Sequence, residues 1–478
     1  MKLLLILAFA SCQTPIARDW VVLEGKGSVL GQAAEIQLEF GPGGAGRLRT
    51  IAELGEELVC DGTRAWVRSW NNPVRELELA DRESALIQFA VLAGTWNDPE
   101  GPIHAERAGA DWELRLRDGR GVFLLAVDPA TGDPMRLTRQ EGAGMEGIAM
   151  EEWRDFGGVR APGRIRRGLL DGADDEFTIT SARRAVASAL EAPVAAAGDF
   201  RFDPAVSATL ETRRAKSGHV LVHPLVDGAD LGWFIFDSGA GALCIDPDAA
   251  QGLGYESFGK VTAVGVAGHT EAGFFRTKTF TLGPLTLNNP IFVSLDLDFI
   301  GAALGERIAG IVGYEVFARS VVQFQAGAAP ELSLHSRASF TLDAGLAWQP
   351  LILDGTVPCI RSRFEGDREG LFRLDTGAGD SVSFHSPAVA RWKLLEGRST
   401  GTTLAGGVGG LKAIRSGELE WFEIGGRRFE AVQAQFYTER EGAFSNQDLD
   451  GNVGLGLLGQ FRLIFDYGGR RVAFAAHS

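Results

Sequence analysis

Two stretches of the sequence decide the fold: GWFIFDSGAG at residues 232–241 and GLFRLDTGAG at residues 370–379. In each stretch an apolar segment runs directly into an aspartate, a hydroxyl residue, a glycine and an alanine. The two aspartates, Asp237 and Asp375, stand 138 residues apart. A single Asp-x-Gly is common turn chemistry, but two copies in matching positions indicate a duplicated unit.

Further features recur in the same order in both halves. The motif GIVG at residues 310–313 matches GNVG at residues 451–454. A glycine cluster precedes this motif each time, at residues 264–268 and 405–410. Chance similarity between glycine-rich strands would not preserve such an order, so the sequence predicts two homologous lobes in one chain, a monomer with an internal pseudo-twofold axis.

The repeated aspartates are candidates for paired carboxylate chemistry. A carboxylate at the end of a buried strand is costly unless it is hydrogen-bonded or functional. If the two loops meet on the axis, the carboxyl groups of Asp237 and Asp375 cannot both ionise and share one proton. The ionised partner then activates a water as general base, and the protonated partner polarises a substrate carbonyl.

These motifs resemble those of bacterial retropepsin-like aspartic proteases, with two lobes fused in tandem across residues 210–475. The resemblance implies a mainly β, bilobal acid-protease barrel fold in which Asp237 and Asp375 are the catalytic pair. Ser238 and Thr376 would then lock the loops together through their hydroxyls, and Gly239 and Gly377 would complete the active-site loops. The Ile-Val-Gly element at residues 311–313 supports the resemblance, and Asn452-Val453-Gly454 does so less cleanly.

The glycine clusters fall where this family carries its flaps, the hairpins that close over the substrate. Gly265, Gly268, Gly406 and Gly407 are the flap candidates, because glycine permits mobility and close approach to a peptide. The alternative is that these segments are ordinary hairpin turns. Neither cluster contains the tyrosine of pepsin-like flaps, and alanine follows each Asp-(Ser/Thr)-Gly where pepsins have a hydroxyl. We therefore expect an activity maximum at about pH 4–6.5 rather than near pH 2.

Composition restricts the partners. The chain has 478 residues, 47 basic against 62 acidic side chains and a net charge of −15. So acidic a surface is a poor match for nucleic acid. Seven histidines and four cysteines show no metal-ligand spacing, so we expect no metal, no cofactor and no disulfide framework. The expected partner is a peptide or unfolded protein substrate.

The first residues indicate export. One lysine and a short apolar run precede Phe-Ala-Ser-Cys at residues 9–12, which resembles a lipobox with Cys12 as the lipidated residue. An ordinary signal peptide or a buried first strand are the alternatives. The resemblance implies a periplasmic protein anchored to the outer membrane through Cys12, and contact with a membrane only through that anchor.

The remaining organisation follows from periodicity. We predict a signal segment at residues 1–19, an antiparallel β domain at 20–184, a linker at 185–205, and lobes at 206–340 and 341–478. Alternating segments such as AEIQLEF at residues 34–40 indicate strands with one face in water. One helix is expected at residues 82–92, and the alanine-rich stretch at 185–198 indicates a short helix, a linker or both.

The N-terminal domain weakly resembles the curved half-barrel of periplasmic lipoprotein carriers, which implies a helix in the hollow of the sheet. The leading function is an exported aspartic endopeptidase. Two alternatives stay open: a catalytically weak or silent peptide-binding envelope protein, and a lipid or lipoprotein carrier acting through the N-terminal domain.

Overall fold

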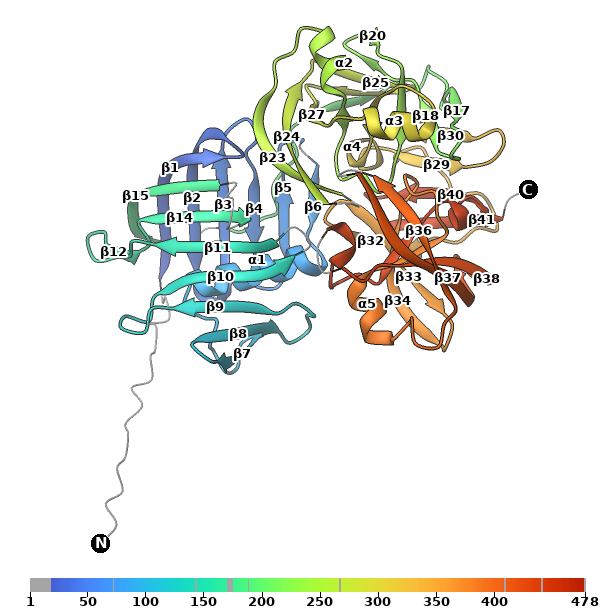
Figure 1. Cartoon of the computed structure of the whole chain (residues 1–478). Coiled ribbons are helices and arrows are strands. Elements are labelled where there is room, and N and C mark those ends of the chain that lie inside the picture. The colour runs from blue at the N-terminus through green and yellow to red at the C-terminus, as the bar shows by residue number, and fades with distance from the viewer. Residues whose placement is uncertain are drawn as a thin grey trace.

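About half of the chain forms β-strands and far less of it forms helices, so the predicted mainly-β class is confirmed (Figure 1). The computed structural model describes residues 19–476 except 72, 142–143, 170–174, 188, 266–267, 408–409 and 440–441. The predicted lipidation site Cys12 lies outside these residues. None of the helices in the described ranges combines the length and the apolar character needed to cross a bilayer.

The N-terminal sheet contains thirteen strands in the order β6-β5-β4-β3-β2-β1-β15-β14-β11-β10-β9-β8-β7. Its strands are β1 (Trp20–Val29), β2 (Gln32–Gly41), β3 (Ala45–Ile51), β4 (Glu57–Cys60), β5 (Ala65–Arg68), β6 (Val74–Glu76), β7 (Ile103–Ala108), β8 (Asp111–Leu116), β9 (Phe123–Val127), β10 (Pro134–Glu141), β11 (Gly144–Glu151), β14 (Arg164–Leu169) and β15 (Asp175–Ala185). A small ribbon pairs β12 (Arg154–Asp155) with β13 (Arg160–Ala161), and a short 3₁₀ turn, η1 (Pro42–Gly44), connects β2 to β3.

One helix, α1 (Leu79–Leu92), packs against this sheet and contacts strands from both halves of it, so the sheet curves around the helix (Figure 1). The prediction of a helix at residues 82–92 is correct, although the helix begins three residues earlier. Its buried face includes Leu86, Ile87 and Phe89, which fill the hollow of the sheet together with apolar strand residues. This apolar packing is the main stabilisation of the domain.

The linker prediction needs a correction. The described residues between β15 and position 199 form neither helix nor strand, which removes the short-helix alternative. The predicted linker at 185–205 nevertheless contains a strand, β16 (Phe200–Phe202), which pairs with β26. The three-residue length of β16 left no periodic signal in the sequence.

Asp237 follows a strand of an eight-stranded sheet, here called the Asp237 sheet, in the order β17-β18-β21-β28-β22-β27-β24-β23. Its strands are β17 (Thr212–Arg214), β18 (Val220–Val222), β21 (Trp233–Phe236), β22 (Cys244–Ile245), β23 (Phe258–Gly265), β24 (Gly268–Arg276), β27 (Ile291–Ser294) and β28 (Ile308–Val312). Beside it lies a five-stranded sheet of β16, β19 (Leu225–Val226), β20 (Ala229–Asp230), β25 (Thr279–Leu282) and β26 (Leu285–Asn288), together with the helices α2 (Pro247–Gly252), α3 (Asp298–Leu304) and α4 (Tyr314–Phe317).

Asp375 follows a strand of a second eight-stranded sheet, the Asp375 sheet, in the order β32-β33-β34-β39-β35-β38-β37-β36. Its strands are β32 (Ile352–Asp354), β33 (Val357–Phe364), β34 (Arg368–Leu374), β35 (Val382–Phe384), β36 (Thr400–Gly407), β37 (Gly410–Ile424), β38 (Arg427–Phe436) and β39 (Gly451–Val453). The helices α5 (Ser386–Trp392) and α6 (Leu455–Leu458) and the turn η3 (Ala443–Ser445) accompany it.

The two sheets share their central order and strand directions. The strand before each aspartate runs parallel to the strand of the GIVG or GNVG motif, β21 with β28 and β34 with β39. That second strand then pairs antiparallel with β22 or β35. Because the neighbouring strands and their directions correspond, the two Asp-(Ser/Thr)-Gly loops lie at equivalent positions of their sheets.

A five-stranded sheet joins the two halves beneath the loops. It combines β29 (Val321–Gln325) and β30 (Glu331–His335) with β31 (Gln349–Pro350), β40 (Phe461–Asp466) and β41 (Arg471–Ala476). Strands from before and after residue 340 are therefore joined in one sheet through the pairing of β29 with β40, and a single apolar core runs through both halves. This continuous core holds the two aspartate loops in fixed relation.

Candidate active site

The two aspartate loops meet at the centre of the C-terminal half. Each loop begins where a buried strand ends, and the backbone N–H of each aspartate donates to the valine carbonyl of the neighbouring motif strand, Asp237 to Val312 at 3.0 Å and Asp375 to Val453 at 2.9 Å. The Phe236 ring packs against Phe317 at a tilt, with ring centroids 4.9 Å apart, and anchors the first strand. The loops thus emerge from rigid elements.

The hydroxyl residues of the loops bind across to the opposite strand. Ser238 Oγ donates to the Leu374 carbonyl at 2.7 Å, and Thr376 Oγ1 donates to the Phe236 carbonyl at 3.1 Å. Each hydroxyl oxygen also accepts from the other residue's backbone N–H, at 2.9 and 3.0 Å. Both side chains are buried. Four reciprocal hydrogen bonds therefore fix the loops to one another.

The glycines let the carboxyl groups approach. Gly239 N–H donates to Asp237 Oδ1 at 2.7 Å, and Gly377 N–H donates to Asp375 Oδ1 at 3.0 Å. A Cβ at Gly239 would lie 2.5 Å from Asp375 Oδ1, and one at Gly377 would lie 2.3 Å from Asp237 Cγ. Each carboxyl group thus occupies the space beside the other loop's glycine, and the two are hydrogen-bonded to each other.

Burial and mutual repulsion perturb this pair. Burial raises the pKa of Asp375 to about 7, the charge of Asp237 acts in the same direction, and Arg373 opposes both. Burial also raises the pKa of Asp237. Because both pKa values shift upwards, the pair is set to hold one proton in weakly acidic solution.

The environment of the pair is asymmetric. Asn452 Nδ2 donates to Asp375 Oδ2 at 3.1 Å, whereas the equivalent position beside Asp237 is Ile311. Asn452 Oδ1 lies 3.1 Å from Nε2 of the fully buried His385. Because the amide nitrogen of Asn452 points to Asp375, the amide oxygen of Asn452 faces the histidine ring. His385 Nε2–H is therefore the donor in the hydrogen bond to Asn452 Oδ1.

Sequence reasoning missed this contact. In the sequence, Asn452 stands out only as a departure from the apolar-apolar-Gly motif, and nothing there marks His385 as its partner. Burial, and secondarily Arg373, lowers the pKa of His385 to about 4, so the ring is neutral and orients the amide. A polar residue at one copy of an otherwise apolar repeated motif was the available signal.

Two more groups border the loops. His219 Nε2 lies 2.8 Å from the Gly377 carbonyl, and Ser217 Oγ lies 2.7 Å from His219 Nδ1. Asp380 is hydrogen-bonded to Ser383, and burial raises the pKa of Asp380 to about 6. His219 therefore braces the second loop, and Asp380 places a third titratable carboxyl group close to the pair.

The four flap-candidate glycines lie at the ends of two hairpins. Gly265 pairs with Gly268 at the end of β23–β24, and Gly407 pairs with Gly410 at the end of β36–β37. A Cβ at Gly406 would lie 3.8 Å from the Phe299 ring of α3, so the second hairpin reaches over to the Asp237 half. The two hairpins belong to the same edge of their respective sheets.

One carboxylate group outside the pair has ligand-like spacing. Single oxygens of Asp246, Asp296 and Asp298 lie within 4.8 Å of one another. Asp246, however, caps α2, with its Oδ1 accepting from Asp248 N–H at 3.1 Å and Ala249 N–H at 3.3 Å. This capping role at the start of α2 accounts for Asp246.

A comparison with known protein families finds a match around the first aspartate loop. Residues 222–316 match a family model described as aspartyl protease. The matched region includes Asp237-Ser238-Gly239 and the Ile-Val-Gly motif that pairs with its strand. No curated protein matches the chain at a significant level. Residues 222–316 thus form a domain that is similar to aspartyl proteases.

Proposed function

We propose that the protein is an exported aspartic endopeptidase, built from two fused lobes, that hydrolyses peptide bonds in unfolded polypeptides. The observation that carries the proposal is the meeting of two Asp-(Ser/Thr)-Gly loops, cross-bonded through Ser238 and Thr376. The common strand order of the Asp237 and Asp375 sheets supports a duplication. The family match over residues 222–316 supports the same chemistry.

The proposed reaction uses one proton shared by Asp237 and Asp375. The ionised carboxylate removes a proton from a water, whose oxygen bonds to the scissile carbonyl carbon, while the protonated carboxyl group donates to the carbonyl oxygen. The tetrahedral intermediate then collapses, its C–N bond breaks, and the amine leaves with a proton from the dyad. The extended substrate would pair its backbone with the hairpin edges.

The pH dependence follows from the same pair. Catalysis needs one proton on two carboxyl groups, and burial raises the pKa of Asp375 to about 7. We expect a bell-shaped profile of kcat/KM whose alkaline limb falls near pH 7 and whose maximum lies in the weakly acidic range. A maximum below pH 3 would contradict this assignment.

The test is hydrolysis of a denatured protein, followed by mass spectrometry of the products. We expect activity that a pepstatin-type transition-state analogue inhibits. Asp237→Asn and Asp375→Asn should each reduce kcat by at least about a thousandfold. Asp298→Asn, which alters an exposed aspartate of α3, is the matched control and should retain activity.

Circular dichroism of each variant separates chemical loss from misfolding. Hydrolysis that persists in both folded dyad variants would overturn the proposal. Peptide binding without hydrolysis by the unaltered chain would instead favour the peptide-binding envelope protein.

We further propose that the chain is exported and anchored through Cys12. The supporting pattern is the lysine, apolar run and lipobox-like Phe-Ala-Ser-Cys at the N-terminus. Metabolic labelling with a fatty acid, followed by detergent fractionation, should label the protein and place it with the membranes. Cys12→Ser should abolish both, and unchanged labelling would refute the anchor.

A further inference from the structure

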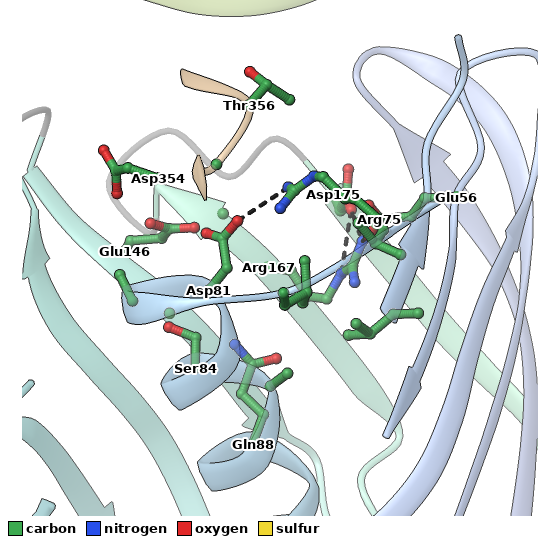
Figure 2. Close-up of a pocket in the computed structure, with 18 of the residues that line it drawn as sticks. Glu56, Arg75, Asp81, Ser84, Gln88, Glu146, Arg167, Asp175, Asp354 and Thr356 are labelled. Carbon is green, nitrogen blue, oxygen red and sulfur yellow. Dashed lines mark hydrogen bonds and ion pairs between the residues drawn. The ribbon is translucent and has the colours of Figure 1, made fainter. Parts of the chain in front are cut away.

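A cavity of about 550 Å³ lies between the N-terminal sheet and the turn that joins β32 to β33 (Figure 2). This volume falls within the range of ligand sites, and interfaces between domains are common places for them. Trp70 and neighbouring aliphatic residues supply an apolar part of the lining. The opposite rim is formed by Asp354, Gly355 and Thr356.

The wall formed by α1 is polar. Ser84 and Gln88 lie one helical turn apart and point into the cavity (Figure 2). Neither side chain is hydrogen-bonded to another residue in the part of the chain that the structure describes. A hydroxyl and an amide facing an open hollow offer both donors and acceptors to a ligand and are unsuited to an acyl chain.

Carboxylates outnumber arginines in the lining, by five to three. Each arginine is already paired with lining carboxylates. Arg75 binds Asp81 at 3.0 Å, Arg167 binds both Glu56 at 3.0 Å and Asp175, and Arg373 binds Asp354. Arg167 thus meets two carboxylates with a single positive charge, and the carboxyl groups of Asp81, Glu146 and Asp354 lie on one side of the cavity (Figure 2). The lining therefore favours a cationic occupant.

The cavity rim is connected to the aspartate pair. Thr356 Oγ1 donates to the carbonyl of Gly241, the last residue of the first repeated stretch, at 3.0 Å. Arg373 lines the cavity and precedes Asp375 by two residues in β34. The rim of the cavity therefore lies directly beside the loop that carries Asp237.

We propose that this cavity is a second binding site for the polypeptide substrate and accepts a segment that carries lysine or arginine side chains. The inference rests on the proposed function and adds the substrate class. Most of the lining comes from the N-terminal sheet and α1, so the site exists only when that domain is docked on the Asp375 half. Binding energy gained so far from the reacting bond is expected to lower KM and leave kcat unchanged.

The test uses the full chain carrying Asp237→Asn and short fluorescein-labelled peptides that share one core and carry lysine, serine or glutamate extensions. Fluorescence anisotropy should show tightest binding for the lysine peptide. Asp81→Asn with Glu146→Gln should weaken that binding about fivefold to tenfold. Gln88→Lys, which adds a positive charge to the helix wall, should weaken it at least as much.

Asp118→Asn with Glu106→Gln is the matched control, because it removes two exposed carboxylates of the same domain outside the cavity, one of them paired with Arg82. It should bind like the parent. Equal affinity for the lysine and serine peptides, or equal binding by the cavity and control variants, would overturn the proposal. The binding measurement needs no hydrolysis, so a failure of the proposed catalysis is seen separately, as an unaltered chain that binds lysine peptides but does not cleave them.

Discussion

At the residue scale, Asp375 illustrates a conflict between stability and chemistry. Burial, with the charge of Asp237, raises its pKa from the ordinary value near 4 to about 7. The folded protein therefore holds a proton that the unfolded chain releases between these pH values. The contribution of Asp375 to stability is retained below pH 4 and is lost as the pH rises to 7.

Asp375→Asn should consequently abolish activity and still stabilise the protein in alkaline solution. We expect the free energy of unfolding at pH 8 to increase by about 1–2 kcal/mol, with no difference at pH 3.5. Urea denaturation at both pH values checks this, with Asp298→Asn as the control. A loss of stability at pH 8 would show that the carboxylate is compensated by its surroundings.

The second prediction concerns Asn452 and the histidine behind it. Asn452→Leu imitates the apolar counterpart Ile311 and removes the N–H that binds Asp375 at 3.1 Å. We expect kcat to fall about tenfold to a hundredfold, and the alkaline limb of the pH profile to move upwards, because the ionised dyad loses a donor.

His385→Phe should shift the profile in the same direction, since it frees the Asn452 amide to rotate. His385→Gln retains an N–H donor and should restore part of the activity. An unchanged pH profile in His385→Phe would reduce the histidine to a packing residue.

At the scale of elements, the β36–β37 hairpin presents two exposed apolar side chains, Leu404 and Leu411, at 65% and 60% exposure. Replacing either side chain should hardly change the free energy of unfolding of the free protein, because neither is buried. Leu411→Ser should therefore leave the unfolding midpoint unchanged and raise KM for long peptides about threefold to tenfold if the hairpin closes over substrate.

Steady-state kinetics with a long and a short substrate check this expectation. Leu124→Ser, at a 38% exposed leucine of β9, is the control and should change neither parameter. Equal KM values for Leu411→Ser and the unaltered chain would favour the interpretation of the hairpin as an ordinary turn.

Local elements were predictable because their signals are local. Apolar runs that end in Asp-(Ser/Thr)-Gly located β21 and β34, and alternation located β2. Both α2 and α5 have a proline in the first turn, a position that proline favours. Strand β16 and the first turn of α1 were missed, since three residues carry no measurable period.

At the scale of the whole molecule, Asn71 joins the N-terminal sheet to the Asp237 half. Its Nδ2 donates to Glu315 Oε1 at 2.7 Å, and its Oδ1 accepts from Ile291 N–H at 2.9 Å. Glu315 Oε2 in turn accepts from Leu243 N–H at 2.6 Å, shortly after the first aspartate loop. The N-terminal domain thus contributes to the support of that loop.

Asn71→Ala should destabilise the full chain by about 3 kcal/mol, because a buried carboxylate and a buried amide lose their partner. Burial raises the pKa of Glu315 and the Asn71 amide opposes that shift, so the loss should grow as the pH rises. Urea denaturation measures it, with Asn97→Ala as the control. Equal stability of both variants would show that the domains are held by other contacts, such as the buried pair of Arg139 and Asp448.

Such contacts lay beyond sequence reasoning. Asn71 and Glu315 are 244 positions apart, and neither carries a motif. The same holds for Glu78, which accepts from Leu353 N–H at 2.8 Å and pairs with Arg470. Only the arrangement of the docked domains shows that these polar residues are hydrogen-bonded to one another. The two aspartates, in contrast, could be paired from the sequence because their motif is repeated.

Asn452 bears on the direction in which a polypeptide can bind. An identical pair of subunits would present the same surroundings to a chain entering from either end. Here one carboxyl group has an amide beside it and the other has the aliphatic Ile311. A peptide threaded backwards would exchange those surroundings, so we expect this protein to accept its targets in one N-to-C direction only.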